Sequence, residues 1–251
     1  MKHLWTLIDK SLNKEQKECY IFDKEHHYLS RVLRLKPGDK VCITNGDGLV
    51  AKGNILEIKK KETKVEVQDV KSFQRKDIKV ELWQALIKRH SLEALVSNMS
   101  ELGVDGIKIF KSLVSQSKSD VKIEKLESLC YESLRVNKSP WLCQIEIKKS
   151  LEELINEEKK TLSKNIVILC DELLTLEKNP SSIYTILKKN LLPETQKIII
   201  VIGCESGLDL KERNLLSKDL ETYSATLGSC ILRAQNAALS AVSNVISYLL
   251  I

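Results

Sequence analysis

The sequence predicts an α/β protein with two domains, a C-terminal domain on a mostly parallel β-sheet and a small N-terminal β domain. From Lys79 onward, apolar runs of four or five residues alternate with amphipathic stretches, a pattern typical of β-α-β units with helices on both faces of a sheet. Before Lys79, short β-rich runs are separated by turn residues. A polar stretch at 71–77 separates the two patterns, so we expect domains at 1–72 and 73–251.

The N-terminal domain begins with a helical segment at 26–35 and continues with β-rich runs at 41–44, 49–58 and 63–70. Asn45-Gly46 lies between the first two runs, and because both residues tolerate positive φ, a tight hairpin is expected there. Lys36-Pro37-Gly38-Asp39 predicts a turn into the first strand. These features together predict a small antiparallel barrel or sheet.

The C-terminal domain is expected to alternate strands with helices along its whole length. The predicted strands lie at 79–85, 106–110, 142–147, 166–170, 197–202 and 223–227. The predicted helices lie at 92–102, 123–136, 151–159, 181–189, 210–216 and 231–250. In open sheets of this kind, ligands bind beyond the carboxyl ends of the strands, so we expect the functional residues in the loops there.

Composition narrows the class of protein. The 251 residues are 43% hydrophobic and 29% charged with a formal net charge of +6, which indicates a globular chain compatible with an anionic partner. No apolar run reaches the roughly 18 residues of a membrane span. The seven cysteines include no C-x-x-C pair and no secretory signal precedes them, so we expect a cytoplasmic protein. Several cysteines have apolar neighbours, and we expect these thiols to be buried and unreactive. Neither the cysteines nor the four histidines predict a metal site.

The helical segment at 26–35 has a polar and an apolar face. The polar face carries His27, Arg31 and Arg34, at positions i, i+4 and i+7. The apolar face carries Leu29, Val32 and Leu33. Three donors in a row suit phosphate groups, although the spacing alone favours an ordinary solvated helix face.

A glycine loop follows the predicted strand at 197–202. Gly203 and Gly207 permit positive φ and close backbone approach, and Asp209 followed by Glu212 has the spacing of a capping box at a helix start. The loop is not the G-x-G-x-x-G fingerprint of dinucleotide binding, so a dinucleotide-dependent oxidoreductase is disfavoured. Taken alone, this loop is weak evidence for a ligand.

A second glycine loop, Leu227-Gly228, leads into the last predicted helix, whose first turns carry Arg233 and Asn236. We expect the two loops at the carboxyl ends of neighbouring parallel strands, so that Arg233 and Glu205 flank one crevice for a nucleotide-like ligand. The alternative is an ordinary amphipathic helix with Arg233 solvated or paired to a surface acid.

Four segments in this order resemble those of a known family, the bacterial 16S ribosomal RNA (uracil-N3)-methyltransferases of the SPOUT, or α/β-knot, superfamily. The segments are His27-Tyr28-Leu29-Ser30-Arg31-Val32-Leu33-Arg34 with Gly38-Asp39, Glu101-Leu102-Gly103-Val104, Gly203-Cys204-Glu205-Ser206-Gly207, and Leu227-Gly228-Ser229-Cys230-Ile231-Leu232-Arg233. The resemblance implies an N-terminal PUA-like RNA-binding barrel and a C-terminal trefoil knot that binds S-adenosylmethionine. It also implies a homodimer that methylates N3 of a uridine in the small ribosomal subunit.

The resemblance also assigns roles to residues. Arg233 would stabilise negative charge on the pyrimidine, and Glu205 would accept a proton or orient Arg233. The cofactor would contact Gly203, Glu205, Gly207, Leu227, Gly228, Ile231 and Leu232. RNA would contact His27, Arg31, Arg34, Lys36 and Asn236.

The chain departs from the family pattern at several of these positions. Cys204 and Ser206 stand within the usual Gly-Pro-Glu-Gly-Gly, and Cys230 replaces an arginine. Gln235 and Asn236 lie where the family has Thr-Glu-Thr-Ala. These differences keep a second hypothesis open, an RNA-binding or ribosome-assembly factor that has the fold without the catalytic activity.

Overall fold

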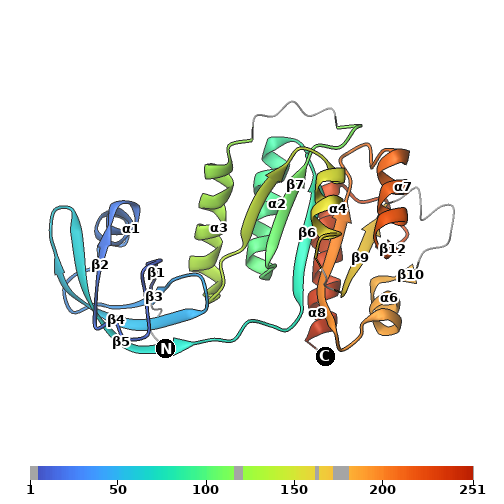
Figure 1. Ribbon diagram of the computed structural model, residues 1–251. Coiled ribbons are helices and arrows are strands. Elements are labelled where there is room, and N and C mark those ends of the chain that lie inside the picture. The colour runs from blue at the N-terminus through green and yellow to red at the C-terminus, as the bar shows by residue number, and fades with distance from the viewer. Residues whose placement is uncertain (1–4, 116–120, 162–163, 172–180, 251) are drawn as a thin grey trace. The chain divides into compact units, whose positions relative to one another are not determined.

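The computed structural model describes residues 5–115, 121–161, 164–171 and 181–250 (Figure 1). Its contacts divide the chain into two compact units. The first unit comprises Met1–Arg75 and Tyr131–Leu142, and the second comprises Lys76–Cys130 and Cys143–Ile251. The domain limits expected from the sequence, 1–72 and 73–251, stay a prediction.

The first unit is built on a five-stranded sheet in the order β1-β3-β4-β5-β2. The strands are β1 (Trp5–Ile8), β2 (Glu18–Phe22), β3 (Lys40–Thr44), β4 (Leu49–Ile58) and β5 (Glu62–Ser72). The predicted hairpin between β3 and β4 is confirmed, and Gly46 in its turn has φ +71°. The purely antiparallel arrangement was wrong, because β1 pairs with β3 in parallel. A parallel pair needs a long crossover connection, and the chain from 9 to 39 provides it.

The core of the first unit lies on one face of this sheet. Alternate residues of β2 are buried, as expected of a strand with one face toward the core and one toward water. The fully or nearly fully buried side chains include Leu7, Ile21, Leu29, Val41, Ile43, Ile55 and Val65. In the segment Tyr131–Leu142 of this unit, Arg135 pairs with Glu25, and its guanidinium lies 4.8 Å from the ring centre of Tyr28.

The predicted helix at 26–35 is not one regular helix. An α-helical turn, α1 (Asp23–His27), passes into a π-helical turn, η1 (Tyr28–Val32), in which the amide of Leu33 donates to the carbonyl of Tyr28 at 2.9 Å. The wider turn changes the angle between successive side chains. As a result Leu29 is buried, whereas Val32, expected on the same apolar face, is 59% exposed.

The second unit is built on a seven-stranded sheet in the order β10-β12-β9-β11-β6-β7-β8, and all of its paired strands are parallel. Its strands are β6 (Lys79–Ala85), β7 (Gly106–Phe110), β8 (Gln144–Lys148), β9 (Lys164–Cys170), β10 (Ser181–Ser182), β11 (Thr195–Ile202) and β12 (Thr222–Thr226). The predicted α/β class and parallel sheet are confirmed. β10 was not predicted.

The two strands that precede the glycine loops are not neighbours, and this part of the prediction was wrong. β9 pairs with β11 on one side and with β12 on the other, so it lies between them. Strands that follow one another in the sequence need not be neighbours in the sheet, and here the chain from β11 to β12 crosses over β9. The carboxyl end of β9 therefore also belongs to the edge where the loops lie.

The described helices that lie wholly in the second unit are α2 (Arg89–Leu102), α4 (Leu151–Glu158), α6 (Ile183–Asn190), α7 (Leu210–Asp219) and α8 (Ala234–Leu249). The helix α3 (Ile123–Asn137) begins in the second unit and ends in the first. α2 and α8 pack against each other, and so do α4 and α7, so that both faces of the sheet are covered (Figure 1). α8 begins at Ala234, three residues later than predicted. Arg233 is its N-cap residue with extended backbone angles, so it does not lie in the first turn.

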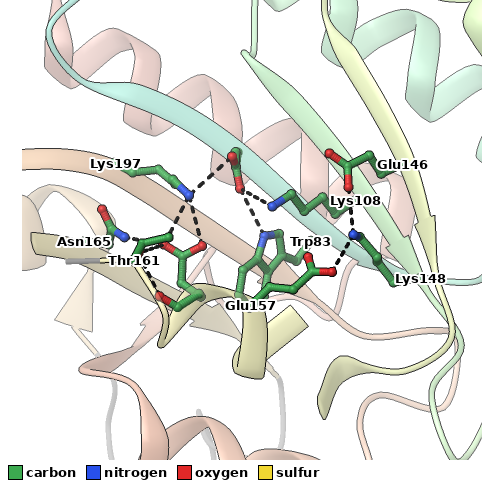
Figure 2. Close-up of polar contacts among 10 residues, drawn as sticks. Trp83, Lys108, Glu146, Lys148, Glu157, Thr161, Asn165 and Lys197 are labelled. Atoms are coloured by element: carbon green, nitrogen blue, oxygen red, sulfur yellow. Dashed lines mark hydrogen bonds and ion pairs between the residues drawn. The ribbon is translucent and has the colours of Figure 1, made fainter. Parts of the chain in front are cut away.

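A charged network anchors α4 to the sheet (Figure 2). The ammonium of Lys197 lies 3.0 Å from the carboxylate of Glu158 at the end of α4 and 3.5 Å from that of Glu81 on β6. Lys108 on β7 lies 3.5 Å from Glu81, and the indole of Trp83 donates to the same carboxylate at 3.3 Å. An unpaired charge in a low-dielectric interior is costly, and here each buried charge has a partner of opposite sign. The strand residues of this network, Glu81, Lys108 and Lys197, lie before the carboxyl ends of their strands.

Candidate functional site

The candidate site is the carboxyl edge of the second unit's sheet. The carboxyl ends of its seven parallel strands lie at this edge, and the segments that follow β11 and β12 contain the two glycine loops. Carboxyl ends of parallel strands are the usual ligand position in open α/β sheets. Within the described residues no group of three or more His, Cys, Asp or Glu side chains could hold a metal ion. None of the described helices is long and apolar enough to cross a membrane.

The loop from Gly203 to Gly207 closes on itself. The amide of Cys204 donates to the carbonyl of Gly207 at 3.2 Å, and the amide of Gly207 donates to the carbonyl of Cys204 at 3.0 Å. A Cβ at Gly203 would lie 2.6 Å from the carbonyl carbon of Gly207, and Gly207 has φ +74°. Both positions therefore require glycine, as the sequence predicted.

The departure at Cys204 has a structural explanation. Its side chain is buried, and the thiol donates to the carbonyl of Gly207 at 3.3 Å. Burial raises the pKa of Cys204, so the thiol stays protonated at neutral pH. Cys204 thus acts as a small buried residue that supports the turn, and not as a nucleophile.

The predicted capping box holds the far end of this loop. Asp209 caps α7, and the carboxylate of Glu212 accepts from the amide of Asp209 at 2.9 Å. Glu212 is buried and also accepts from the hydroxyl of Ser112 at 2.7 Å and from the amide of Leu113 at 3.2 Å. Because Ser112 and Leu113 follow β7, Glu212 joins two segments of the same edge.

The near end of the loop is held by Gln84, the sixth residue of β6, whose side chain is completely buried. Its Nε2 donates to the carbonyl of Gly203 at 3.0 Å and to that of Ala85 at 2.9 Å. Gln84 was not among the residues predicted from the sequence. An amide among the apolar residues Leu82, Trp83 and Ala85 is the signal that points to it.

A buried ion pair lies beneath the loop. Asp171 directly follows β9, and its Oδ2 lies 2.8 Å from Nε of Arg213 on α7. A Cβ at Gly207 would meet Nη2 of Arg213 at 3.4 Å and Oδ2 of Asp171 at 3.8 Å. Neither residue was predicted from the sequence, although a carboxylate at the end of an apolar strand is a recognisable signal.

Glu205, at the tip of the loop, is exposed, and its carboxylate points to the start of α2. Its Oε1 accepts from the backbone amide of Lys88, the N-cap residue of that helix, at 3.3 Å. A carboxylate at a helix N-terminus interacts favourably with the helix dipole. No hydrogen bond or ion pair joins Glu205 to Arg233 in the part of the chain that the structure describes, so their shared crevice stays a prediction.

The second loop is open and largely exposed. Gly228 has φ +133°, and a Cβ there would meet no atom within 4 Å. Thr226 donates its hydroxyl hydrogen to the carbonyl of Gly228 at 3.1 Å, which fixes the start of the loop. Ile231 is 76% and Leu232 37% exposed. Two exposed apolar side chains beside an open glycine offer a surface for a partly apolar ligand.

The residues predicted to contact RNA are exposed. In the first unit these are His27, Arg31, Arg34 and Lys36, and in the second unit Asn236. The even helical spacing of the first three was wrong, because η1 interrupts it and Arg34 has φ +52°. The predicted turn at Lys36 is confirmed, since Asp39 accepts from the amide of Lys36 at 2.7 Å.

Two family models match the chain. One, an RNA methyltransferase domain, matches residues 74–246, and the other, an RNA methyltransferase PUA domain, matches residues 23–68. Among curated proteins, ribosomal RNA small subunit methyltransferase E of Rickettsia conorii is 26% identical over 245 residues, covering 98% of this chain and 96% of that protein. The protein of the same name from Bacillus subtilis is 25% identical over 258 residues, covering 99% and 96%.

Solved structures share the fold. Ribosomal RNA small subunit methyltransferase E from Neisseria gonorrhoeae, bound to S-adenosyl methionine, matches with a TM-score of 0.83 at 15% identity, over 98% of both chains. A putative methyltransferase from Legionella pneumophila, in complex with the same cofactor, matches with a TM-score of 0.79 at 20% identity, over 98% and 97%. These likenesses confirm the predicted fold class.

Proposed function

Because the chain belongs to the RNA methyltransferase family, we propose that it transfers a methyl group from S-adenosylmethionine to N3 of a uridine in 16S ribosomal RNA. The observation that carries this proposal is the pair of glycine loops at one edge of a sheet whose fold is shared with cofactor-bound relatives. The substrate follows from the names of the relatives together with the motifs that resemble the uracil-N3 family. We further propose a cytoplasmic homodimer.

The residues at this edge fit S-adenosylmethionine. The space around Gly228 is open, so a ligand can approach the backbone there, and Gly203 and Gly207 hold the first loop in its closed turn at the same edge. Leu227, Ile231 and Leu232 would cover apolar parts of the cofactor, while Glu205 lies at the loop tip. When bound, the cofactor supplies an activated methyl group on its sulfonium, so the protein mainly has to hold the reacting atoms in line.

Arg233 and Glu205 are the proposed catalytic residues. N3 of uridine carries a proton, and negative charge develops on the pyrimidine as this proton leaves. The exposed guanidinium of Arg233 would stabilise that charge. The carboxylate of Glu205, held by the amide of Lys88, would accept the proton or orient Arg233.

RNA contacts divide between base and backbone. N3 lies on the Watson-Crick edge, so the base must be unpaired or extruded to reach the cofactor. His27, Arg31, Arg34 and Lys36 would hold phosphates and set position without reading sequence. Asn236, in the first turn of α8, would contact the nucleotide beside Arg233.

Methyl transfer tests the proposal directly. The purified chain, given radiolabelled S-adenosylmethionine and small ribosomal subunits, should label 16S RNA, and mass mapping should place the methyl group on N3 of a uridine. Arg233→Ala should lower the rate about 100-fold, a typical loss for one charge-stabilising group. Label on another base or atom would contradict the proposed specificity, and an unchanged rate would remove Arg233 from the mechanism.

A second function is favoured by one observation, the exposed Cys230 in place of an arginine of the resembled family. A non-catalytic RNA-binding or ribosome-assembly factor with this fold would not need that arginine. Titration calorimetry with S-adenosylmethionine separates the two functions: micromolar binding supports the enzyme, and absence of binding supports the assembly factor.

A further inference from the structure

Gln84 lies at the junction between the sheet and the first glycine loop. It pairs in register with Ile202, the last residue of β11, so its side chain lies beside the point where the loop begins. Its Nε2 reaches the carbonyls of Gly203 and Ala85, at 3.0 and 2.9 Å. These two acceptors fix the orientation of the amide, because a flipped amide would place Oε1 against both carbonyl oxygens.

The side-chain oxygen of Gln84 makes no stabilising hydrogen bond with the described residues. Oε1 of Gln84 is buried and has no hydrogen-bond partner among the described residues. A buried acceptor without a partner costs stability, and an apolar residue of similar volume would avoid that cost. Fold stability alone therefore does not account for a glutamine in this strand, and the donation to Gly203 is what distinguishes it from a leucine or methionine.

We infer that Gln84 is a positioning residue for the cofactor loop. By holding the carbonyl of Gly203, it fixes the point from which the closed turn between Cys204 and Gly207 leaves the sheet. The inference rests on the proposed function, because it assigns to this turn the binding of S-adenosylmethionine. Gln84 acts through the backbone of the loop and not on the reacting atoms.

The test compares Gln84→Met with Leu82→Ala. Methionine keeps the volume and removes both donated hydrogen bonds. Leu82 is completely buried two residues earlier on the same face of β6, so its truncation lowers the melting temperature without touching the loop. Hydrogen exchange of the Cys204 and Gly207 amides and the Kd of S-adenosylmethionine by calorimetry are measured on the full chain.

Gln84→Met should speed exchange at both amides at least tenfold and raise the Kd at least tenfold. Leu82→Ala should lower the melting temperature and leave exchange and Kd within twofold of the unmodified chain. Unchanged loop exchange in Gln84→Met, or an equal effect of Leu82→Ala, overturns the inference. If the unmodified chain binds no S-adenosylmethionine, the proposed function fails, and the exchange result still decides the role of Gln84. Should Gln84→Met fail to fold, Gln84→Asn, whose shorter amide does not reach Gly203, replaces it with the same expectation.

Discussion

The carboxylate of Glu205 accepts a hydrogen bond from the backbone amide of Lys88 at 3.3 Å, across 117 residues of sequence. This contact joins the loop after β11 to the start of α2, which follows the neighbouring strand β6. The proposed proton acceptor is therefore held by a helix N-terminus. Glu205 therefore has two separable roles, one in accepting this hydrogen bond and one in accepting a proton. A neutral side chain with an oxygen acceptor would keep the hydrogen bond and lose the negative charge.

Glu205→Gln should preserve cofactor binding and lose catalysis. The glutamine oxygen still accepts from Lys88, so we expect the Kd of S-adenosylmethionine to stay within twofold. Loss of a general base typically lowers the rate by about 100-fold or more. Calorimetry and single-turnover methyl transfer measure the two quantities. A rate equal to that of the unmodified chain would restrict Glu205 to a structural role.

Gly203→Ala should disrupt the first loop. The added Cβ would meet the backbone of Gly207 at 2.6 Å, so the turn must shift. We expect cofactor affinity to fall at least tenfold. Gly103→Ala is the matched control, since Gly103 has φ +78° with open space around it, and the strain of about 1 to 2 kcal/mol affects stability alone. Equal cofactor affinity in both variants would show that the turn is not part of the binding site.

Arg213→Leu should destabilise the fold by about 3 kcal/mol, because it takes the guanidinium away from the buried carboxylate of Asp171. Lys164→Ala is the control, since the pair between Lys164 and Glu194 is largely exposed and contributes at most about 1 kcal/mol. Urea unfolding monitored by tryptophan fluorescence measures both. Similar losses for the two variants would mean that the Asp171 pair contributes no more than a surface pair.

Thiol reactivity should single out Cys230. This thiol is exposed beside the second loop, whereas burial raises the pKa of Cys19 to about 12 and also raises that of Cys204. At pH 8, below these raised values, Cys19 and Cys204 remain thiols and react slowly. A hydrogen bond with Cys143 lowers the pKa of Cys130, but its side chain is buried and inaccessible to the reagent. We expect one fast phase with Ellman's reagent, absent in Cys230→Ser and slowed by S-adenosylmethionine. A fast phase that the cofactor leaves unchanged would place the cofactor away from this loop.

Hydrophobic periodicity predicted much of the second unit. β6 and β7 have the predicted bounds, because continuous apolar runs flanked by polar residues mark buried parallel strands. The first unit was harder to predict, and β1 and β2 were missed, although β2 is as long as the predicted β3. The position of β9 between β11 and β12 depends on crossovers, which local sequence does not encode.

The candidate site was predicted in part. The glycine requirement at Gly203 and Gly207 follows from sequence, since no other residue fits such a turn. The supports of the loop, Gln84 and the pair of Asp171 with Arg213, come from elements distant in the sequence, so only the fold reveals them. Arg233 precedes α8 because the chain stays extended through that residue, which helical periodicity did not indicate.

The position of β9 sets the span of the proposed ligand site. Two interstrand steps separate the ends of β11 and β12, which places the glycine loops about 10 Å apart whatever residues they contain. Backbone hydrogen bonding, and not loop side chains, maintains this spacing. Substitutions such as Cys204, Ser206 and Cys230 therefore alter the lining of the site while leaving the length of molecule it accommodates unchanged.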